Sequence, residues 1–306
     1  MPTNTAHVTY RPLRVALLAN AAFSMLSGLA FIAFASTIAE RIGHAIPASL
    51  IAGLGVMLVP FGGLTAWVGT RRHPPTWTAL LISVSDLAWA AASVVVIVVA
   101  QAHLTSEGNA LIVGVALAVL GFALAQLHGI GRVYRVGGET DGRIRVCIEI
   151  QTTGDADTVW RNVADLGGIA RFAPILAKSA LREEATSNVG ALRDCVDRAG
   201  RKWGERCVRF DPAKRELEMD FLADQPGFPF PFSTLRGGWE VQSTPSGVAV
   251  KIWWEGRLRQ PRLAAVISPL LAWRAQRQFS TVVRQMAGHA PSRRAAAAPR
   301  LVVVPC

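Results

Sequence analysis

The chain has 306 residues, which is enough for two domains of ordinary size. Hydrophobic residues make up 51% of it, and 32 Lys and Arg against 21 Asp and Glu give a formal net charge of +11. Charged residues are sparse up to about Gly142 and dense after it, so the first part is far more hydrophobic than a soluble core requires. This composition excludes a protein that is soluble along its whole length.

Four apolar stretches in the first part each run about 22 to 25 residues, long enough for a helix to cross a hydrocarbon core of ~30 Å. They are rich in Gly, Ala and Ser, which allow close helix packing in lipid. The sequence therefore predicts an all-α four-helix transmembrane bundle over residues 1–135. The predicted spans are residues 13–35, 48–69, 77–101 and 110–131.

The basic residues in the connections predict how the bundle is oriented. The flank before the first span, the connection between the second and third spans, and the exit from the fourth are all basic. They carry Arg11, Arg14, Arg71, Arg72, Arg132 and Arg135. The other connections hold only Arg41, offset by Glu40, and no basic residue around Glu107. Both termini are therefore expected on the cytoplasmic side, together with the domain that follows the bundle.

One ionisable residue interrupts the apolar spans. Asp86 lies about nine residues into the third span, where a charge is costly unless it is paired, protonated or facing a wet cavity. Asn20 and Gln126 could be its hydrogen-bonding partners, and the three residues form a candidate polar site in the membrane. They could be a functional site or could simply tie helices together. A single buried carboxylate does not indicate an ion-coupled pump, which would be expected to bury more charges.

Residues 11–135 resemble an uncharacterised family of small four-span bacterial membrane proteins. The resemblance is carried by the segments LRVALLANAAFSMLSGLAFIAF, SDLAWAAASVVV and LAQLHGIGR. It implies the topology and a bacterial origin, and it implies no activity. Together with the charge distribution it places the chain in the bacterial cytoplasmic (inner) membrane as a multi-pass protein.

From Arg143 the hydrophobic period changes from helical to alternating, which is typical of strands. The first predicted strand covers residues 143–151, and a short helix capped near Asp155 follows it. Turn signals separate the later strands, and Pro245-Ser246-Gly247 joins the last two as a hairpin. Further strands are predicted at residues 191–196, 202–210, 215–222, 234–242 and 248–258.

A long final helix is predicted from Ser268, a natural N-cap, with Pro269 at its first position. Its apolar residues fall on one face, so the strands should fold around it as an antiparallel sheet in an α+β architecture. A mostly apolar ligand cavity would form between the sheet and the helix. The predicted limits are 136–142 for a linker, 143–288 for this domain and 289–306 for a disordered tail.

The order of these elements resembles the START-like (helix-grip) superfamily, also labelled SRPBCC, and specifically its polyketide cyclase/dehydrase branch. The matching segments are IRVCIEI, DADTVWRNVADLGGIARFAP, VGALRDC, WGERCVRFDPAKRELEM and VAVKIWWEGRL. The superfamily includes carriers of hydrophobic ligands as well as ring-closing enzymes. The resemblance therefore implies that the domain binds a hydrophobic small molecule or lipid, and it leaves the reaction open.

Two charged residues fall on positions that often line the cavity in that superfamily: Arg193 in VGALRDC and Glu205 in WGERCVRF. A buried pair between neighbouring strands could fix the polar end of an apolar ligand. The alternative is an ordinary cross-strand ion pair on the solvated face of the sheet.

Aromatic residues are the second group of candidate ligand-binding residues, and they could equally be plain core. Trp253 and Trp254 are adjacent and must point to opposite faces of a strand, so at most one of them lines the cavity. Phe230 belongs to the loop PGFPFPF, which could form a lid over the cavity or rest on the membrane surface. The aromatic candidates are Phe172, Trp203, Trp239, Trp253 and Phe230.

Several kinds of site find no support in the second half. It contains no His before His289, so a Ser–His or Cys–His nucleophile pair is not predicted. The cysteines form no C-x-x-C pair and no His lies at ligand spacing from them, so neither a metal site nor a cofactor is predicted. The chain also lacks a recognised nucleic-acid-binding module, and nucleic acid is not a predicted partner.

Three functions remain open. The first is membrane-anchored binding, and possibly transfer, of a hydrophobic molecule that is most available at the bilayer. The second is a polyketide cyclase/dehydrase-like enzyme acting on a membrane-associated substrate, with Glu205 and Arg193 as the catalytic candidates. The third is a sensor in which the ligand affects the membrane bundle through the linker. The predicted partners are the ligand and the bilayer, whose anionic headgroups suit the basic strip between Arg257 and Arg284.

Overall fold

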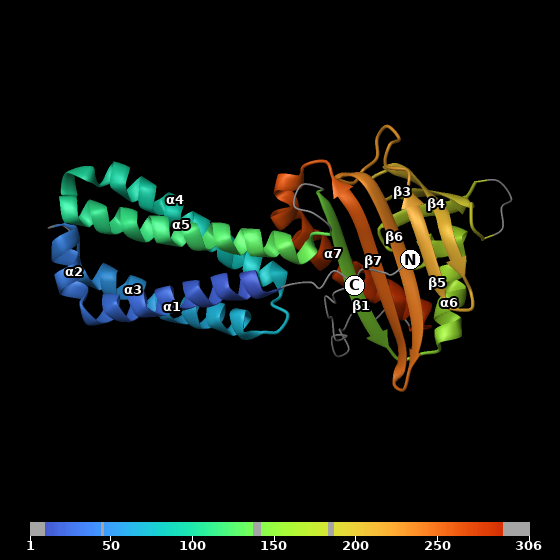
Figure 1. Cartoon of the computed structure of the whole chain (residues 1–306), viewed down its shortest axis with the longest axis horizontal. Helices are drawn as coiled ribbons and strands as arrows, with labels where there is room; N and C mark the ends of the chain where they lie inside the picture. The colour runs from blue at the N-terminus through green and yellow to red at the C-terminus, as the bar shows by residue number, and fades with distance from the viewer. Residues whose placement is uncertain (1–9, 44–45, 137–141, 183–186, 290–306) are drawn as a thin grey trace. The chain divides into compact units, whose positions relative to one another are not determined.

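A computed structural model describes residues 10–43, 46–136, 142–182 and 187–289 of the chain, which divides into two compact units. The unit formed by residues 8–133 is helical, and the described residues from 134 onward form mainly an α+β domain (Figure 1). The linker predicted at 136–142 and the tail predicted at 289–306 lie almost entirely outside the described residues.

The helical unit contains four helices that are long and apolar enough to cross a membrane. They agree with the four predicted spans to within a few residues at each end. A short helix, α2 (Ala35–Ile42), follows the first of them and was not predicted, because its mixed residues give no spanning signal. Large apolar side chains such as Leu26 and Val99 stay exposed on the long helices, a surface suited to lipid. These helices are α1 (Arg11–Ala33), α3 (Ala48–Thr70), α4 (Thr76–Val99) and α5 (Ser106–Tyr134).

Glycines let the helices of this unit approach one another closely. A Cβ atom on Gly28 of α1 would lie 3.0 Å from the backbone oxygen of Gly55 in α3. A Cβ on Gly129 of α5 would lie 2.7 Å from the Cα of Leu13 in α1, closer than real Cβ atoms come. Glycine is therefore needed for close helix packing at Gly28 and Gly129, whereas Gly121 of α5 faces open space.

Replacing Gly129 by Ala should weaken the bundle, because the added methyl meets the backbone of α1 and forces the helices apart. We expect a cost of about 1–3 kcal/mol, typical of overpacking. The matched control is Gly121→Ala, which adds a methyl to the same helix in open space and should be neutral or stabilising by up to ~1 kcal/mol. Thermal unfolding of the full-length protein in detergent measures both variants. Equal unfolding temperatures for the two would contradict the close contact.

The second unit is built on a seven-stranded antiparallel sheet in the order β1-β7-β6-β5-β4-β3-β2. Six of the seven strands coincide with predicted ones. The missed strand is β2, whose sequence LAKSAL does not alternate between apolar and polar residues. The strands are β1 (Arg143–Thr152), β2 (Leu176–Leu181), β3 (Leu192–Asp197), β4 (Lys202–Asp211), β5 (Glu216–Phe221), β6 (Phe232–Thr244) and β7 (Gly247–Leu258).

Helices cover one face of this sheet, with the long α7 (Ala264–Met286) passing behind the strands in Figure 1. The short helices α6 (Ala156–Ala164) and η2 (Leu166–Arg171) connect β1 to β2. We call the face toward α7 the inner face, because the ring of Phe279 in α7 contacts side chains of β6 and β7 there. Paired residues of neighbouring strands share a face, so the register assigns each strand residue to the inner or the outer face.

The start of α7 differs from the prediction. A single turn, η3 (Pro261–Leu263), leads directly into the helix at Ala264, so the helix begins before the predicted N-cap. Ser268 is therefore inside the helix and fully buried, and Pro269 lies in its second turn. The rest of the predicted architecture, an antiparallel sheet with a long C-terminal helix, is confirmed.

Candidate functional site

Arg193 of β3 and Glu205 of β4 are direct cross-strand partners. Glu205 in turn pairs with Phe221 of β5, which lies in the same row as Leu235 of β6, on the inner face. Only 8% of Arg193 and 4% of Glu205 is exposed. The structure thus has the buried arrangement, and the alternative of a solvated ion pair on the outer face is wrong.

The Arg193–Glu205 pair is held by further hydrogen bonds. One guanidinium nitrogen of Arg193 forms the ion pair with Glu205 Oε2, and Nη1 donates to the carbonyl oxygen of Leu166 at 2.9 Å. Trp203 Nε1 donates to Glu205 Oε1 at 2.6 Å, so both carboxylate oxygens are occupied. Arg193 Nε is buried and finds no acceptor among the described residues. Nε is therefore the one guanidinium nitrogen without an acceptor among the described residues, while each carboxylate oxygen has a donor.

The charges of this pair and its burial shift the pKa values of neighbouring groups. Burial alone would lower the pKa of Arg193, but the negative charge of Glu205 raises it above its ordinary value, and the guanidinium stays charged. Cys195 and Cys207 are free thiols beside the pair. Burial raises the pKa of both, and the charge of Glu205 raises that of Cys195 further. These thiols are therefore protonated and unsuited to nucleophilic catalysis.

Aromatic rings surround the polar pair on one side. Phe230 packs edge-on against Trp203 at 5.2 Å between ring centroids and against Phe228 at 5.3 Å. Phe221 lies 6.2 Å from the same ring. The loop that carries Phe228 and Phe230 thus turns its rings toward the domain interior, which leaves little ring surface for contact with a membrane.

The inner face carries a second aromatic group farther along the sheet. Trp239 and Trp254 lie 5.5 Å and 4.9 Å from the ring of Phe279 in α7. All three remain only half-buried although β6 and β7 are central strands covered by α7. On the outer face, by contrast, Trp253 is 7% exposed beneath the guanidinium of Arg145. Accessible surface therefore remains between the sheet and α7.

Two of the predicted aromatic candidates are not in this arrangement. Trp253 stacks over Gly238 on the outer face, so its assignment to the cavity is wrong, and Trp254 has the inner position. Phe172 ends η2 and contacts the Arg171 guanidinium, with no ring contact to the inner-face group among the described residues. Alternation within one strand does not show which of the two tryptophans faces α7. The pairing of Trp254 with Gly237, which in turn pairs with Met219, assigns Trp254 to the inner face.

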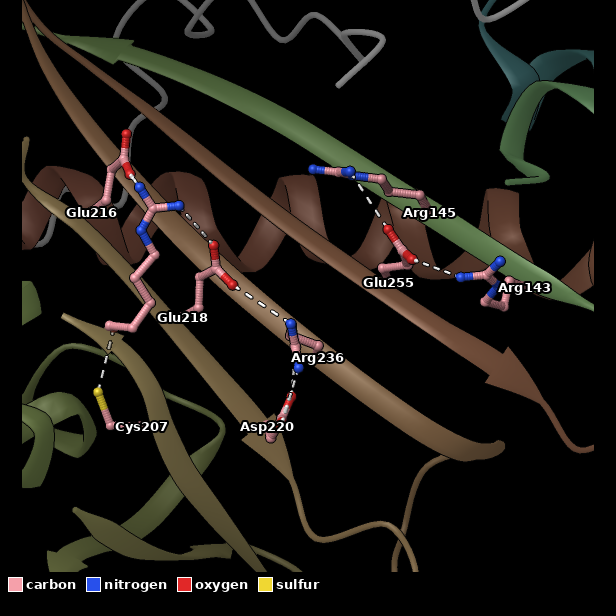
Figure 2. A network of polar contacts seen from close by, with 9 residues as sticks. Arg143, Arg145, Cys207, Glu216, Glu218, Asp220, Arg236 and Glu255 are labelled. Atoms are coloured by element: carbon pink, nitrogen blue, oxygen red, sulfur yellow. Dashed lines mark hydrogen bonds and ion pairs between the residues drawn. The ribbon is translucent and has the colours of Figure 1, made fainter. Parts of the chain in front are cut away.

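The outer face carries charged side chains in place of rings. Figure 2 shows Arg236 between Glu218 and Asp220, and Glu255 between two arginines of β1, with α7 behind the strands. Arg236 Nε lies 2.6 Å from Asp220 Oδ1, and about half of its side chain is exposed. Such solvated pairs contribute about 0–1 kcal/mol each. A hollow of about 950 Å³ over this face is lined by both signs of charge, largely paired with each other.

In the helical unit, the predicted partners of Asp86 are confirmed. Asn20 Nδ2 and Gln126 Nε2 both donate to Asp86 Oδ2, at 2.8 Å and 3.1 Å. The hydroxyls of Ser24 and Ser83 lie within hydrogen-bonding distance of the two amide oxygens. All five side chains are at least nine-tenths buried, and they join α1, α4 and α5.

No group of three or more His, Cys, Asp or Glu within the described ranges could hold a metal ion.

Comparison with known proteins identifies the second unit. Residues 143–290 match the family described as polyketide cyclase / dehydrase and lipid transport. The match covers the whole sheet and α7 and is slightly less than half of the chain, so the C-terminal domain is similar to members of this family. No curated protein matches the chain.

Solved structures with a similar fold match the same half. Norcoclaurine synthase from Thalictrum flavum, solved with dopamine and hydroxybenzaldehyde, is 14% identical, with a TM-score of 0.39 over 52% of this chain and 96% of that chain. A protein from Thermobifida fusca is 23% identical, with a TM-score of 0.38 over 47% and 93%. The protein XoxI from Bacillus cereus is 15% identical, with a TM-score of 0.36 over 48% and 94%.

Glu205→Gln should destabilise the C-terminal domain, because it leaves the charge of Arg193 buried without a counter-charge. We expect a loss of about 3–5 kcal/mol, and recovery of most of it when Arg193→Met is added. Urea-dependent alkylation of Cys195 and Cys207, resolved by mass spectrometry on the full-length protein in detergent, measures the local unfolding.

The control for this measurement is Glu218→Gln, which removes a carboxylate from the solvated outer face and should cost at most ~1 kcal/mol. If Glu205→Gln and Glu218→Gln expose the thiols at the same urea concentration, the Arg193–Glu205 pair contributes no more to the stability of the domain than a solvated pair does.

Proposed function

We propose that the C-terminal domain binds a hydrophobic small molecule or lipid between the inner face of its sheet and α7. The observation that carries the proposal is the buried Arg193, whose Nε donor is unused among the described residues and lies on a face lined by half-buried aromatic rings. Binding sites for small molecules combine mostly apolar walls with a few fixed polar groups, and this combination fits that description.

The polar end of the ligand is expected to be a hydrogen-bond acceptor. Arg193 is held by Glu205 and by the carbonyl of Leu166, so its guanidinium is positioned before any ligand arrives. A carbonyl, hydroxyl or carboxylate oxygen of the ligand would then accept from Nε. Trp239, Trp254 and Phe230 would contact the apolar or ring-bearing remainder.

Binding is better supported than catalysis at this site. A general base needs a carboxylate lone pair directed at the substrate, and Arg193 and Trp203 already take one lone pair on each oxygen of Glu205. The neighbouring thiols are protonated and do not supply a nucleophile. A cyclase- or dehydrase-like reaction would have to use the remaining lone pairs of Glu205 or displace one of these partners.

The membrane half gives this binding domain its location. We propose that the four spans anchor it in the bacterial inner membrane with both termini in the cytoplasm, since the basic connections lie on one side. A ligand that is insoluble in water is concentrated in the bilayer, and tethering raises its effective concentration at the site. Transfer of the ligand to or from the bilayer follows from the same arrangement.

Loss of the Arg193 donor should weaken ligand retention. We expect the purified full-length protein to carry a co-purifying lipid or aromatic compound, detected by native mass spectrometry. Arg193→Met, made together with Glu205→Gln so that Glu205 is not left buried without a counter-charge, should reduce affinity for that compound roughly tenfold or more, as expected for losing a hydrogen bond to a charged group. Arg236→Met on the outer face removes the same charge and should leave retention unchanged. The absence of any bound compound after incubation with a host lipid extract, or equal retention by both variants, would refute the proposed binding.

The orientation can be tested with paired cysteine substitutions in two connections whose side chains are exposed. Glu107→Cys is expected outside the cytoplasm, and Arg72→Cys inside it. A membrane-impermeant maleimide applied to intact cells should label the first variant and not the second, while both label after the cells are opened. The reverse labelling pattern would overturn the assignment.

A further inference from the structure

The helical unit contains a cavity next to Asp86. Its volume is about 240 Å³, slightly below the usual range of about 300–1,000 Å³ for pockets that bind small molecules. The wall is largely apolar and aromatic, formed by Phe23, Phe31, Phe61, Trp89, Leu54 and Met57. Asp86 supplies the one ionisable group in the wall, and Ser24, Ser27 and Ser85 supply hydroxyls.

Asp86 has capacity left for a ligand. Asn20 and Gln126 both donate to its Oδ2 oxygen, and no donor to Oδ1 exists among the described residues. None of the ion pairs of the described residues includes Asp86. A carboxylate that is 3% exposed in an apolar bundle is costly unless a positive charge or a donor compensates it.

Two of the three hydroxyls of the wall also favour a donor. The Ser85 hydroxyl donates to the Leu81 carbonyl at 3.0 Å, and the Ser24 hydroxyl donates to Asn20 Oδ1 at 3.1 Å. With their hydrogens committed, these two oxygens can act only as acceptors. Besides the Ser27 hydroxyl, which can donate or accept, the cavity therefore presents acceptors to its contents, among apolar rings.

We propose that this cavity binds a protonated amine with an apolar body, its ammonium group at Asp86 and its hydrocarbon part among Phe23, Phe61 and Trp89. An ammonium group carries three donors and a positive charge, which matches a carboxylate flanked by acceptor oxygens. Aromatic faces next to the carboxylate favour a cation as well. This site is separate from the one proposed on the sheet, and either can be wrong without the other.

The test compares phenylpropylamine with phenylpropanol, its uncharged counterpart, by calorimetry on the full-length protein in lipid nanodiscs at neutral pH. We expect the amine to bind about tenfold or more tightly than the alcohol, the effect of one charge-assisted hydrogen bond in a buried site. Asp86→Asn should abolish that preference. Ser27→Leu should weaken both compounds, because it fills the cavity without touching the polar cluster.

The matched control is Glu107→Gln, which removes an exposed carboxylate from the same unit and should leave the preference for the amine unchanged. Equal affinity of the wild-type protein for amine and alcohol would overturn the proposal without reliance on any variant. It would also be overturned if Asp86→Asn kept the preference, or if Ser27→Leu bound the amine as tightly as the wild type, because binding would then reflect partition into lipid.

Discussion

Burial of the Arg193–Glu205 pair constrains the whole C-terminal domain. Among the ion pairs of the described residues, it is the one with both side chains almost fully buried. Removing two charges from water is costly, and the cost is offset only when the geometry is good and the other polar atoms are satisfied. Register between β3 and β4, the Leu166 carbonyl and the Trp203 indole must therefore all be in place together. A slip of either strand by one residue would turn its own charge to the outer face and leave the other buried without a partner.

The two faces of the sheet differ in what their charges do. On the outer face, Arg236 and Glu218 are solvated, and their ion pair contributes little to stability. These charges keep the surface hydrophilic but do not determine the fold. On the inner face, the Arg193–Glu205 pair lies near aromatic rings that α7 covers only in part. Aromatic residues packed to completion would resemble Trp253, which is almost fully buried. The half-buried Trp239 and Trp254 are what a domain needs if it is to admit an apolar ligand.

Much of the fold, though less of the site, could be predicted from the sequence. Spans and most strands follow from length and from period, which are local properties. Strand β2 was not predicted because its sequence LAKSAL lacks alternation. The prediction for Trp253 is wrong because the sequence of one strand does not reveal which of its sides meets a helix. That choice depends on pairing with β6, a contact between residues distant in sequence. The Asp86 partners were predictable because few polar groups exist in the spans and each must find another.

The buried polar groups of the two units lack opposite kinds of hydrogen-bond partner. At Arg193 each oxygen of the Glu205 carboxylate already has a donor while Nε of the cation has no acceptor, so the complement is an acceptor. At Asp86 the amides saturate one oxygen and the other remains open, so the complement is a donor. A ligand that offers a carbonyl or carboxylate oxygen to the first site would place an acceptor against the second carboxylate, which would repel it. The chemistry of the sites therefore argues for two different occupants, and against a single molecule handed from one site to the other.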